Sequence, residues 1–137
     1  MKVEICDSAS SDLEAIYLVD EESASIIVSI LDEMDNDEEL ADTLIIHHYR
    51  DIQDPAYDVS RFQAFYHKGF NIYRLKCWDY QGSVVPYRVV YAHYRDRIYV
   101  LAVVERGKLN YDDKNSEINQ RIIRDYGQLG IPTFKLY

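Results

Sequence analysis

The stretch YRVVYAHYRDRIYVLAVVERGKLNYD, residues 87–112, decides the fold of this chain. Two segments rich in β-branched and aromatic residues, 84–94 and 98–104, flank the short polar connection at 95–97. This pattern predicts two antiparallel strands joined by a tight turn. The hairpin would carry arginines to one end and finish in Arg106 and Tyr111.

Arginine and tyrosine at the end of a hairpin suit the handling of a phosphate ester. A guanidinium group keeps its proton, binds phosphate and stabilises charge that develops in a transition state. A tyrosine can transfer a proton or stack on a base. Arg106 and Tyr111 therefore suit a nuclease. The alternative is structural: Tyr111 would anchor a turn, and a strand arginine such as Arg88 would pair with a carboxylate on an acidic helical layer.

Upstream of the hairpin, residues 71–78 alternate with a period of two, which predicts another strand before a turn at Gln81-Gly82. The three strands would form an antiparallel meander. Arg74 and Lys76 share one face of the first strand. They would either add positive charge for RNA binding or form the solvated side of a half-buried sheet.

The N-terminal region predicts a strand and a helical layer. Residues 2–6 read as a short strand, and Ser11 with Glu14 forms a capping box before an apolar series at helical spacing. That series continues to Met34, and the acidic run at 20–22 could split it into two helices.

Further signals complete the predicted order of elements. Asn36 and Glu39 repeat the capping pattern and should open another helix, and residues 51–58 should form a loop. Ser116 should cap a final helix that ends before Pro132. The sequence thus predicts an α+β fold in which N-terminal helices pack on a mostly antiparallel sheet.

Length and composition predict a single domain over residues 1–137, of which 47% are hydrophobic. Its charge is divided unevenly. Residues 1–60, the strand and helical layer, hold 17 acidic and 2 basic residues, whereas residues 61–137, the sheet and last helix, hold 7 acidic and 13 basic residues. The basic half can present a local positive patch despite the net charge of −9. The alternative is a solvated acidic layer over a mildly basic sheet.

The apolar runs, cysteines and histidines predict where the protein acts and which kinds of site it lacks. The longest apolar run, 98–104, is too short to span a membrane, and acidic residues near the N-terminus argue against a signal peptide, so we expect a cytoplasmic protein. Cys6 and Cys77 should be buried, reduced thiols. The adjacent His47 and His48 do not face one metal from a helix, and the other histidines are distant, so we expect no metal or other cofactor.

The segment from about Phe62 to Pro132 resembles the RelE/ParE toxin superfamily of bacterial toxin–antitoxin systems. The resemblance rests on IYRLKCW, PYRVVYA, YVLAVVER and NYD, followed by RIIRDYGQLGIP. It implies a small microbial RNase fold with helices on one face of the sheet and a basic concave face left open. It also implies a toxin that binds mRNA on the ribosome and is held in check by a cognate antitoxin protein.

In the RelE branch, the ribose 2′-hydroxyl of the mRNA attacks the adjacent phosphate in the ribosomal A site. The resemblance implies that Arg88, Arg106 and Tyr111 form this site. From their residue types, Arg88 would bind the scissile phosphate, Arg106 would stabilise the developing charge or assist the leaving oxygen, and Tyr111 would take the 2′-hydroxyl proton or orient the base. Arg74 and Lys76 match the family's upstream lysines less closely and would bind RNA. Intramolecular attack of this kind needs no bound metal. His93 and Glu105 are reserve candidates for the general base.

Two departures from the family pattern keep alternatives open. Toxins of this type tend to be basic and under about a hundred residues, whereas this chain is longer and acidic. One alternative is a ParE-like toxin that binds gyrase without nuclease residues. The other is a toxin fold that no longer cleaves RNA and serves as an interaction module.

Overall fold

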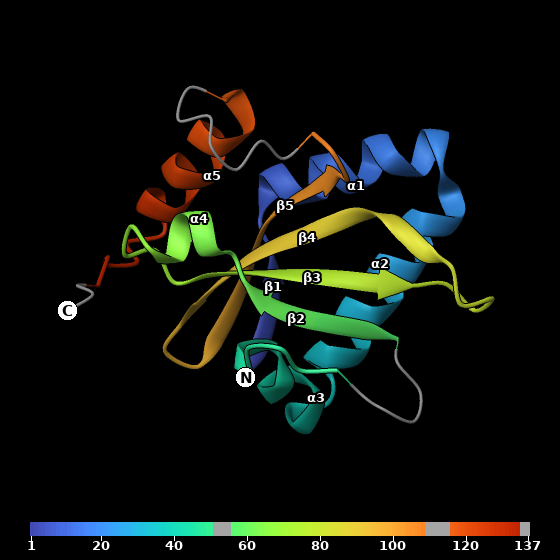
Figure 1. Ribbon diagram of the computed structural model, residues 1–137, viewed down its shortest axis with the longest axis horizontal. Helices are drawn as coiled ribbons and strands as arrows, with labels where there is room; N and C mark the ends of the chain where they lie inside the picture. Colours follow the sequence, from blue (N-terminus) through green and yellow to red (C-terminus); the bar gives the residue numbers. More distant parts are fainter. Residues whose placement is uncertain (51–55, 109–115, 135–137) are drawn as a thin grey trace.

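The computed structural model describes residues 1–50, 56–108 and 116–134, which form one five-stranded sheet with helices on both faces (Figure 1). The strand order is β1-β5-β4-β3-β2, with β1 parallel to β5 and the other neighbours antiparallel. The expected α+β class is confirmed. The elements, in chain order, are β1 (Lys2–Ile5), α1 (Asp7–Val19), α2 (Glu21–Asp35), α3 (Glu38–Asp42), the 3₁₀ helix η1 (Thr43–Ile45), β2 (Tyr57–Arg61), α4 (Gln63–Tyr66), β3 (Ile72–Trp78), β4 (Val84–Tyr94), β5 (Arg97–Glu105) and α5 (Glu117–Gln128).

The predicted meander is present as β3, β4 and β5. β4 has the predicted bounds, and Arg95 makes the tight turn to β5 with a φ of 55°. The predicted alternation of side chains is also present. Successive residues of β3 and β4 point to opposite faces of the sheet, and each face belongs to a different core. Leu75 and Val89 lie in the core on one face, whereas Ile72 and Val90 lie in the core on the other.

The acidic helical layer packs on the first of these faces, as expected. α1 and α2 bury an apolar stripe against the sheet, with Ile27, Leu31 and Met34 of α2 at most 2% exposed. Each such side chain contributes about 1.5–3 kcal/mol when it leaves water. The predicted split of the long apolar series is confirmed, because Asp20 separates the two helices and its side chain accepts a hydrogen bond from the Ser23 amide at 3.1 Å.

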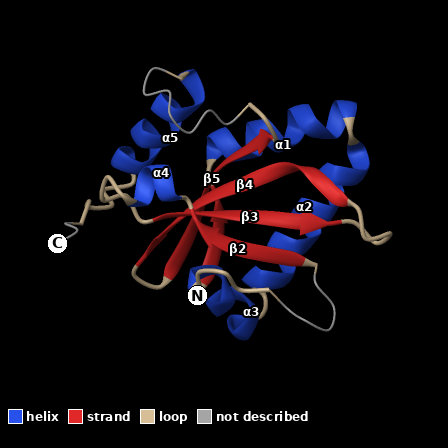
Figure 2. Ribbon diagram, in the orientation of Figure 1, coloured by secondary structure: helices blue, strands red, loops and turns tan. Residues whose placement is uncertain are grey.

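The opposite face is not left fully open, unlike the arrangement that the family resemblance implies. α5 and α4 cover one end of it, where Ile122 and Tyr126 pack on Val90 and Leu101 (Figure 2). The Tyr126 hydroxyl accepts a hydrogen bond from the Asn71 amide at 3.2 Å and donates one to the Pro132 carbonyl at 3.0 Å. These bonds fix α5 on the sheet and restrict the open part of this face to the opposite end of the strands.

Two helices begin at residues other than those that the capping signals predict. Ser11 does not open α1 but lies inside it, because the helix begins at Asp7 directly after β1, with Cys6 as an N-cap that makes no side-chain cap bond. α3 is capped by Asp37 and not by Asn36, and the Asp37 carboxylate accepts from the Glu39 amide at 3.0 Å. The final helix begins as predicted, since the Ser116 hydroxyl accepts from the Asn119 amide at 3.5 Å.

The loop predicted over residues 51–58 is wrong at its end. Tyr57 and Asp58 already belong to β2, which pairs with β3 through Asp58↔Lys76 and Ser60↔Arg74. The strand forms because Tyr57 and Val59 enter the core while Asp58, between them, faces the other way. Residues 51–55 lie outside the described part of the chain.

Polar groups occupy both edges of the sheet. At β1, the Val3 amide donates to the Asp35 carboxylate at 2.9 Å. At β2, the Val59 amide donates to the Tyr49 carbonyl and the Arg61 amide donates to His47 Nδ1, both at 2.9 Å. These bonds reduce the capacity of either edge to pair with a strand of another chain. Among the described residues, no helix combines the length and apolar character that crossing a membrane requires.

Candidate phosphate-binding site

Four basic side chains line one small pocket on the open end of the sheet: two belong to β3, one belongs to β4, and one directly follows β5. Lys76 of β3 stands opposite Arg88 of β4, and Arg74 lies two residues before Lys76 on the same face. Arg106 follows β5, and its amide donates to the Pro86 carbonyl at 2.8 Å, which sets it diagonally beside Arg88. All four side chains line a cavity of about 170 Å³. The sequence-predicted cations are therefore brought together.

Arg88 is the least exposed of these four cations. It is 8% exposed, and its Nη1 donates to the Val85 carbonyl at 3.2 Å and the Tyr87 carbonyl at 3.4 Å. These bonds to its own strand hold the guanidinium group in a fixed orientation. A fixed cation loses little conformational entropy when it binds an anion, which favours its use in a binding site.

Arg74 and Lys76 are half-buried and rest on aromatic rings. The Arg74 guanidinium lies 5.7 Å from the centre of the Phe62 ring, and Lys76 Nζ lies 5.3 Å from that of Trp78. Arg50 also lies over Trp78, at 4.7 Å. Cation–π contacts of this kind orient long side chains that would otherwise sample many rotamers.

Arg106 is exposed and stands at the mouth of the pocket. It directly follows β5, and Gly107 then turns the chain with a φ of 94°, a conformation that favours glycine. Arg106 has more conformational freedom than Arg88. The pocket thus combines one fixed, buried arginine with one that can move toward a ligand.

Asp58 and Ser60 also line the pocket and were not identified from the sequence. They belong to β2, and their cross-strand partners are Lys76 and Arg74. The signal that could have found them is the alternation of apolar and polar residues over 57–60. With four cations and the Asp58 carboxylate, the pocket still has an excess of positive charge.

The pocket and the acidic helical layer lie on opposite faces of the sheet. Lys76 and Arg88 alternate with Cys77 and Val89, which pack in the core beneath α1 and α2. The predicted charge asymmetry therefore becomes a spatial separation of charge. This placement also removes Arg88 from the helical carboxylates that the structural alternative assigned to it.

The pocket has the size and chemistry to hold a single anionic group. Its volume is below the roughly 300–1,000 Å³ of sites that bury a drug-sized ligand. Guanidinium and ammonium groups on several sides match the oxygens of one phosphoryl group and stabilise added negative charge there.

The reserve candidates His93 and Glu105 do not line this pocket. Tyr111 lies outside the described residues. His93 Nε2 is 2.7 Å from the Arg95 carbonyl oxygen at the far end of β4, and Glu105 forms an ion pair with Lys108 at 3.3 Å. Among the described residues, Asp58 is the carboxylate that lines the pocket. Within residues 1–50, 56–108 and 116–134, no group of three or more His, Cys, Asp or Glu side chains has metal-binding geometry.

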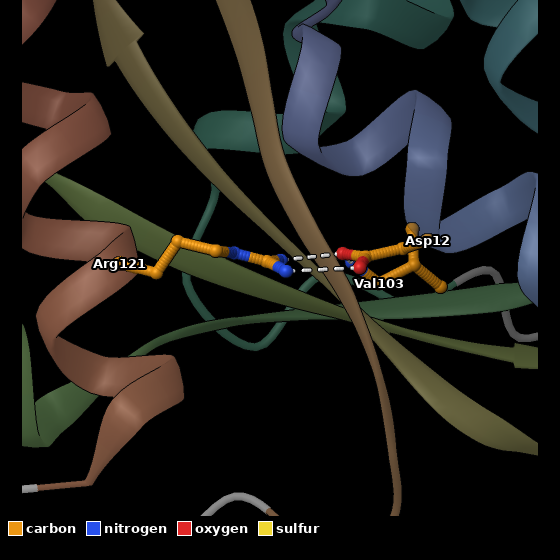
Figure 3. A network of polar contacts seen from close by, with 3 residues as sticks. All are labelled: Asp12, Val103 and Arg121. Atoms are coloured by element: carbon orange, nitrogen blue, oxygen red, sulfur yellow. Dashed lines mark hydrogen bonds and ion pairs between the residues drawn. The ribbon is translucent and has the colours of Figure 1, made fainter.

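An ion pair secures the end of β5 that leads to Arg106 (Figure 3). Asp12 of α1 accepts from the Val103 amide at 3.0 Å and from Arg121 of α5, with Arg121 Nη1 3.0 Å from Asp12 Oδ1. β1 pairs with β5 only as far as Val100, so Asp12 supplies an acceptor that the sheet lacks beyond that point. The ion pair thus links α1 and α5, which pack on opposite faces of the sheet, at β5.

Comparisons of this chain with protein-family models, with curated proteins and with solved structures find no match.

Proposed function

We propose that this protein is a toxin of the RelE type, a ribosome-dependent endoribonuclease that cleaves mRNA by 2′-hydroxyl attack. The observation that carries the proposal is the convergence of Arg74, Lys76, Arg88 and Arg106 on one phosphate-sized pocket. Two of these are the arginines that the RelE resemblance assigns to catalysis. Its partners would be mRNA on the ribosome and a cognate antitoxin, and it would act in the cytoplasm.

Each side chain at the pocket would have a separate task in the reaction. The 2′-oxygen forms a bond to phosphorus as the bond from phosphorus to the 5′-oxygen breaks, which leaves a cyclic phosphate and a new 5′-hydroxyl. Arg88 holds the scissile phosphate, and Arg106 stabilises the charge that develops on its oxygens. Arg74 and Lys76 bind the flanking backbone and raise the local positive field.

A proton must leave the 2′-hydroxyl, and another must reach the 5′-oxygen. Solvent water supplies this second proton, and Arg106 assists the leaving oxygen by hydrogen bonding. The resemblance assigns the first transfer to Tyr111. Asp58 is a second candidate, because its carboxylate lines the pocket. Since the nucleophile is already part of the RNA, its attack gains from proximity and needs no bound metal.

The test is cleavage of mRNA on purified ribosomes by the wild type, Arg106→Ala and Arg124→Ala. Arg124 is an exposed arginine of α5 outside the pocket, so its replacement removes the same charge without touching the site. Loss of Arg106 should slow cleavage by more than about tenfold, because it removes a donor to the transition state. Arg124→Ala should cleave at the wild-type rate.

Replacing the nucleotide before the cut with its 2′-deoxy form should abolish cleavage but not binding, because only the nucleophile is lost. Cleavage of that deoxy substrate, or an unchanged rate in a folded Arg106→Ala variant, would reject the proposed mechanism.

A second candidate is a toxin fold that acts by binding a protein, as a ParE-like gyrase poison or a non-catalytic module. The net charge of −9 and the acidic helical layer favour this candidate, because both oppose association with ribosomal RNA. A binding toxin should arrest growth without mRNA cleavage and should tolerate the loss of Arg106. A non-toxic module should produce neither effect.

A further inference from the structure

A groove of about 900 Å³ lies between α1 and α2, away from the phosphate pocket. Leu13 and Tyr17 of α1 line it at a spacing of one helical turn, and Ala24 and Val28 of α2 do the same. The lining of α2 reaches Asp32, eight residues beyond Ala24, which is about 12 Å along the helix. The groove is therefore as long as about two turns of a bound helix.

Small side chains keep this groove open. Ser25 and Ser29 occupy consecutive turns of α2, and Ser10 lies across from them on α1. None of the three fills the space between the helices. Larger side chains at these positions would close the groove, so the serines maintain a hollow surface without contributing to the core.

Exposed apolar side chains are concentrated at this groove. Tyr17 is 51% exposed, Val28 is 44% exposed and Leu18 is 84% exposed, and all three line it. Val19, the next residue of α1, is 81% exposed. A cluster of apolar surface on one helical hairpin is typical of a protein interaction site.

The acidic residues around the groove indicate that its occupant is positively charged. Residues 7–35, which include both helices, hold nine acidic residues and no Lys, Arg or His. Glu14 and Asp32 are among the lining residues, and Glu21 accepts a hydrogen bond from the Tyr17 hydroxyl at 3.1 Å. An apolar centre with an acidic rim complements a helix that has one apolar face and flanking Lys or Arg side chains.

The same charges argue against other occupants. A second copy of this chain would bring nine acidic residues against nine others, and like charges at an interface are unfavourable. Phosphates of nucleic acid would be repelled in the same way.

We propose that the groove between α1 and α2 binds a basic amphipathic helix of a partner protein. The apolar face of that helix packs on Leu13, Tyr17 and Val28, and its cationic residues face Glu14 and Asp32. The groove and the phosphate pocket lie on opposite faces of the sheet, so the partner leaves the pocket accessible. This inference does not depend on the proposed RNA cleavage.

Binding of a labelled model peptide to the full chain, measured by fluorescence anisotropy without RNA, tests this proposal. The peptide has about 15 residues, enough to form a helix, with leucines on one face and lysines on the other. A second peptide carries glutamate in place of each lysine. The lysine peptide should bind, more weakly as salt is added, and the glutamate peptide should not.

Two tryptophan variants locate the binding. Ser25→Trp fills the groove without changing the charge, and it should weaken binding by at least about tenfold, or about 1.4 kcal/mol. Tyr80→Trp is the matched control, because Tyr80 is 91% exposed and does not line the groove. It should bind like the wild type. Circular dichroism and thermal unfolding would confirm that both variants are folded.

Several results would overturn the proposal. Equal binding to folded Ser25→Trp would mean non-specific attraction to an acidic surface, and equal binding of the glutamate peptide would remove the charge argument. No binding even at millimolar peptide would reject a helix site. Self-association of the wild type that Ser25→Trp abolishes would assign the groove to a second copy of the chain. None of these results depends on cleavage activity.

Discussion

Arg88 shows how the neighbours of a residue on the sheet determine the position and orientation of its side chain. Its strand alternates between two cores, so its side chain emerges on the face away from the acidic helices, and two carbonyls of its own strand fix the guanidinium group. Arg106 has few such constraints and stands at the pocket mouth. We expect Arg88 to contribute mainly to phosphate binding and Arg106 mainly to the rate.

The two cysteines make stability depend on pH under alkaline conditions. Both are free thiols, and burial raises the pKa of Cys77 to about 12 and that of Cys6 to about 11, from an ordinary value of 9.0. Above pH 9 the unfolded thiols ionise while the folded ones stay protonated. A raised folded pKa thus contributes stability that is fully present below pH 9 and is lost as pH rises toward 11 and 12.

The free energy of unfolding should therefore fall between pH 9 and 11, by up to about 1.4 kcal/mol per pH unit for each thiol. Urea unfolding at several pH values measures this fall. The double variant Cys6→Ala, Cys77→Ala should show a shallower slope, with the tyrosines left to titrate in both proteins. Identical slopes would mean that the thiols are accessible in the folded state.

At the level of elements, most of the sheet was predictable from local sequence patterns. β3 was found because its side chains alternate with a period of two, and β4 and β5 were found because both are rich in β-branched and aromatic residues and flank a turn signal. β2 was missed because it is short and follows a proline-containing segment. α4 was missed because four residues are too few for a helical period to appear.

The candidate site, like the sheet, was predictable in most of its residues. Arg74, Lys76, Arg88 and Arg106 follow from strand alternation and from the family resemblance. The alternation over 57–60 could have assigned Asp58 to the polar face of a strand, but its place in the pocket depends on the pairing of β2 with β3 across a gap in sequence. Ser11 misled the helix prediction because the end of β1, and not a capping side chain, determines where α1 begins.

The Asp12–Arg121 pair should stabilise the arrangement of β5 between the two helical layers. Its side chains are 18% and 25% exposed, between the cases of a buried and a surface ion pair. Arg121→Ala should therefore lower the free energy of unfolding by about 2 kcal/mol. Arg124→Ala, which removes an exposed arginine of the same helix, should change it by less than about 0.5 kcal/mol.

Urea unfolding of these variants with Asp12→Asn completes a double-mutant cycle. Asparagine keeps an acceptor for the Val103 amide but removes the charge, so the cycle isolates the ion pair. A coupling free energy near zero, with equal effects of Arg121→Ala and Arg124→Ala, would show that the pair contributes nothing to stability.

For the whole molecule, the sheet separates an acidic layer from a basic pocket. RNA binding should therefore depend on a few local contacts and not on the net charge of −9. Each phosphate contact to single-stranded RNA contributes about −0.7 to the slope of log K against log salt concentration. Arg88→Ala should make that slope less negative by about 0.7, because Arg88 is the arginine expected to bind phosphate.

Fluorescence anisotropy of a labelled single-stranded RNA over a range of salt concentrations measures the slope. Arg124→Ala is again the matched control and should keep the wild-type slope. If both variants shift the slope equally, binding is set by overall charge and the pocket has no special part in it.

Primer extension on a cellular mRNA after brief induced expression tests the central claim most directly. The comparison is between the wild type, a folded Arg88→Ala, Arg106→Ala double variant and Arg124→Ala. We expect new cleavages within translated codons for the wild type and Arg124→Ala, and none for the double variant. Growth arrest without cleavage, or cleavage that persists in the double variant, would contradict the assignment of RNA cleavage to this pocket.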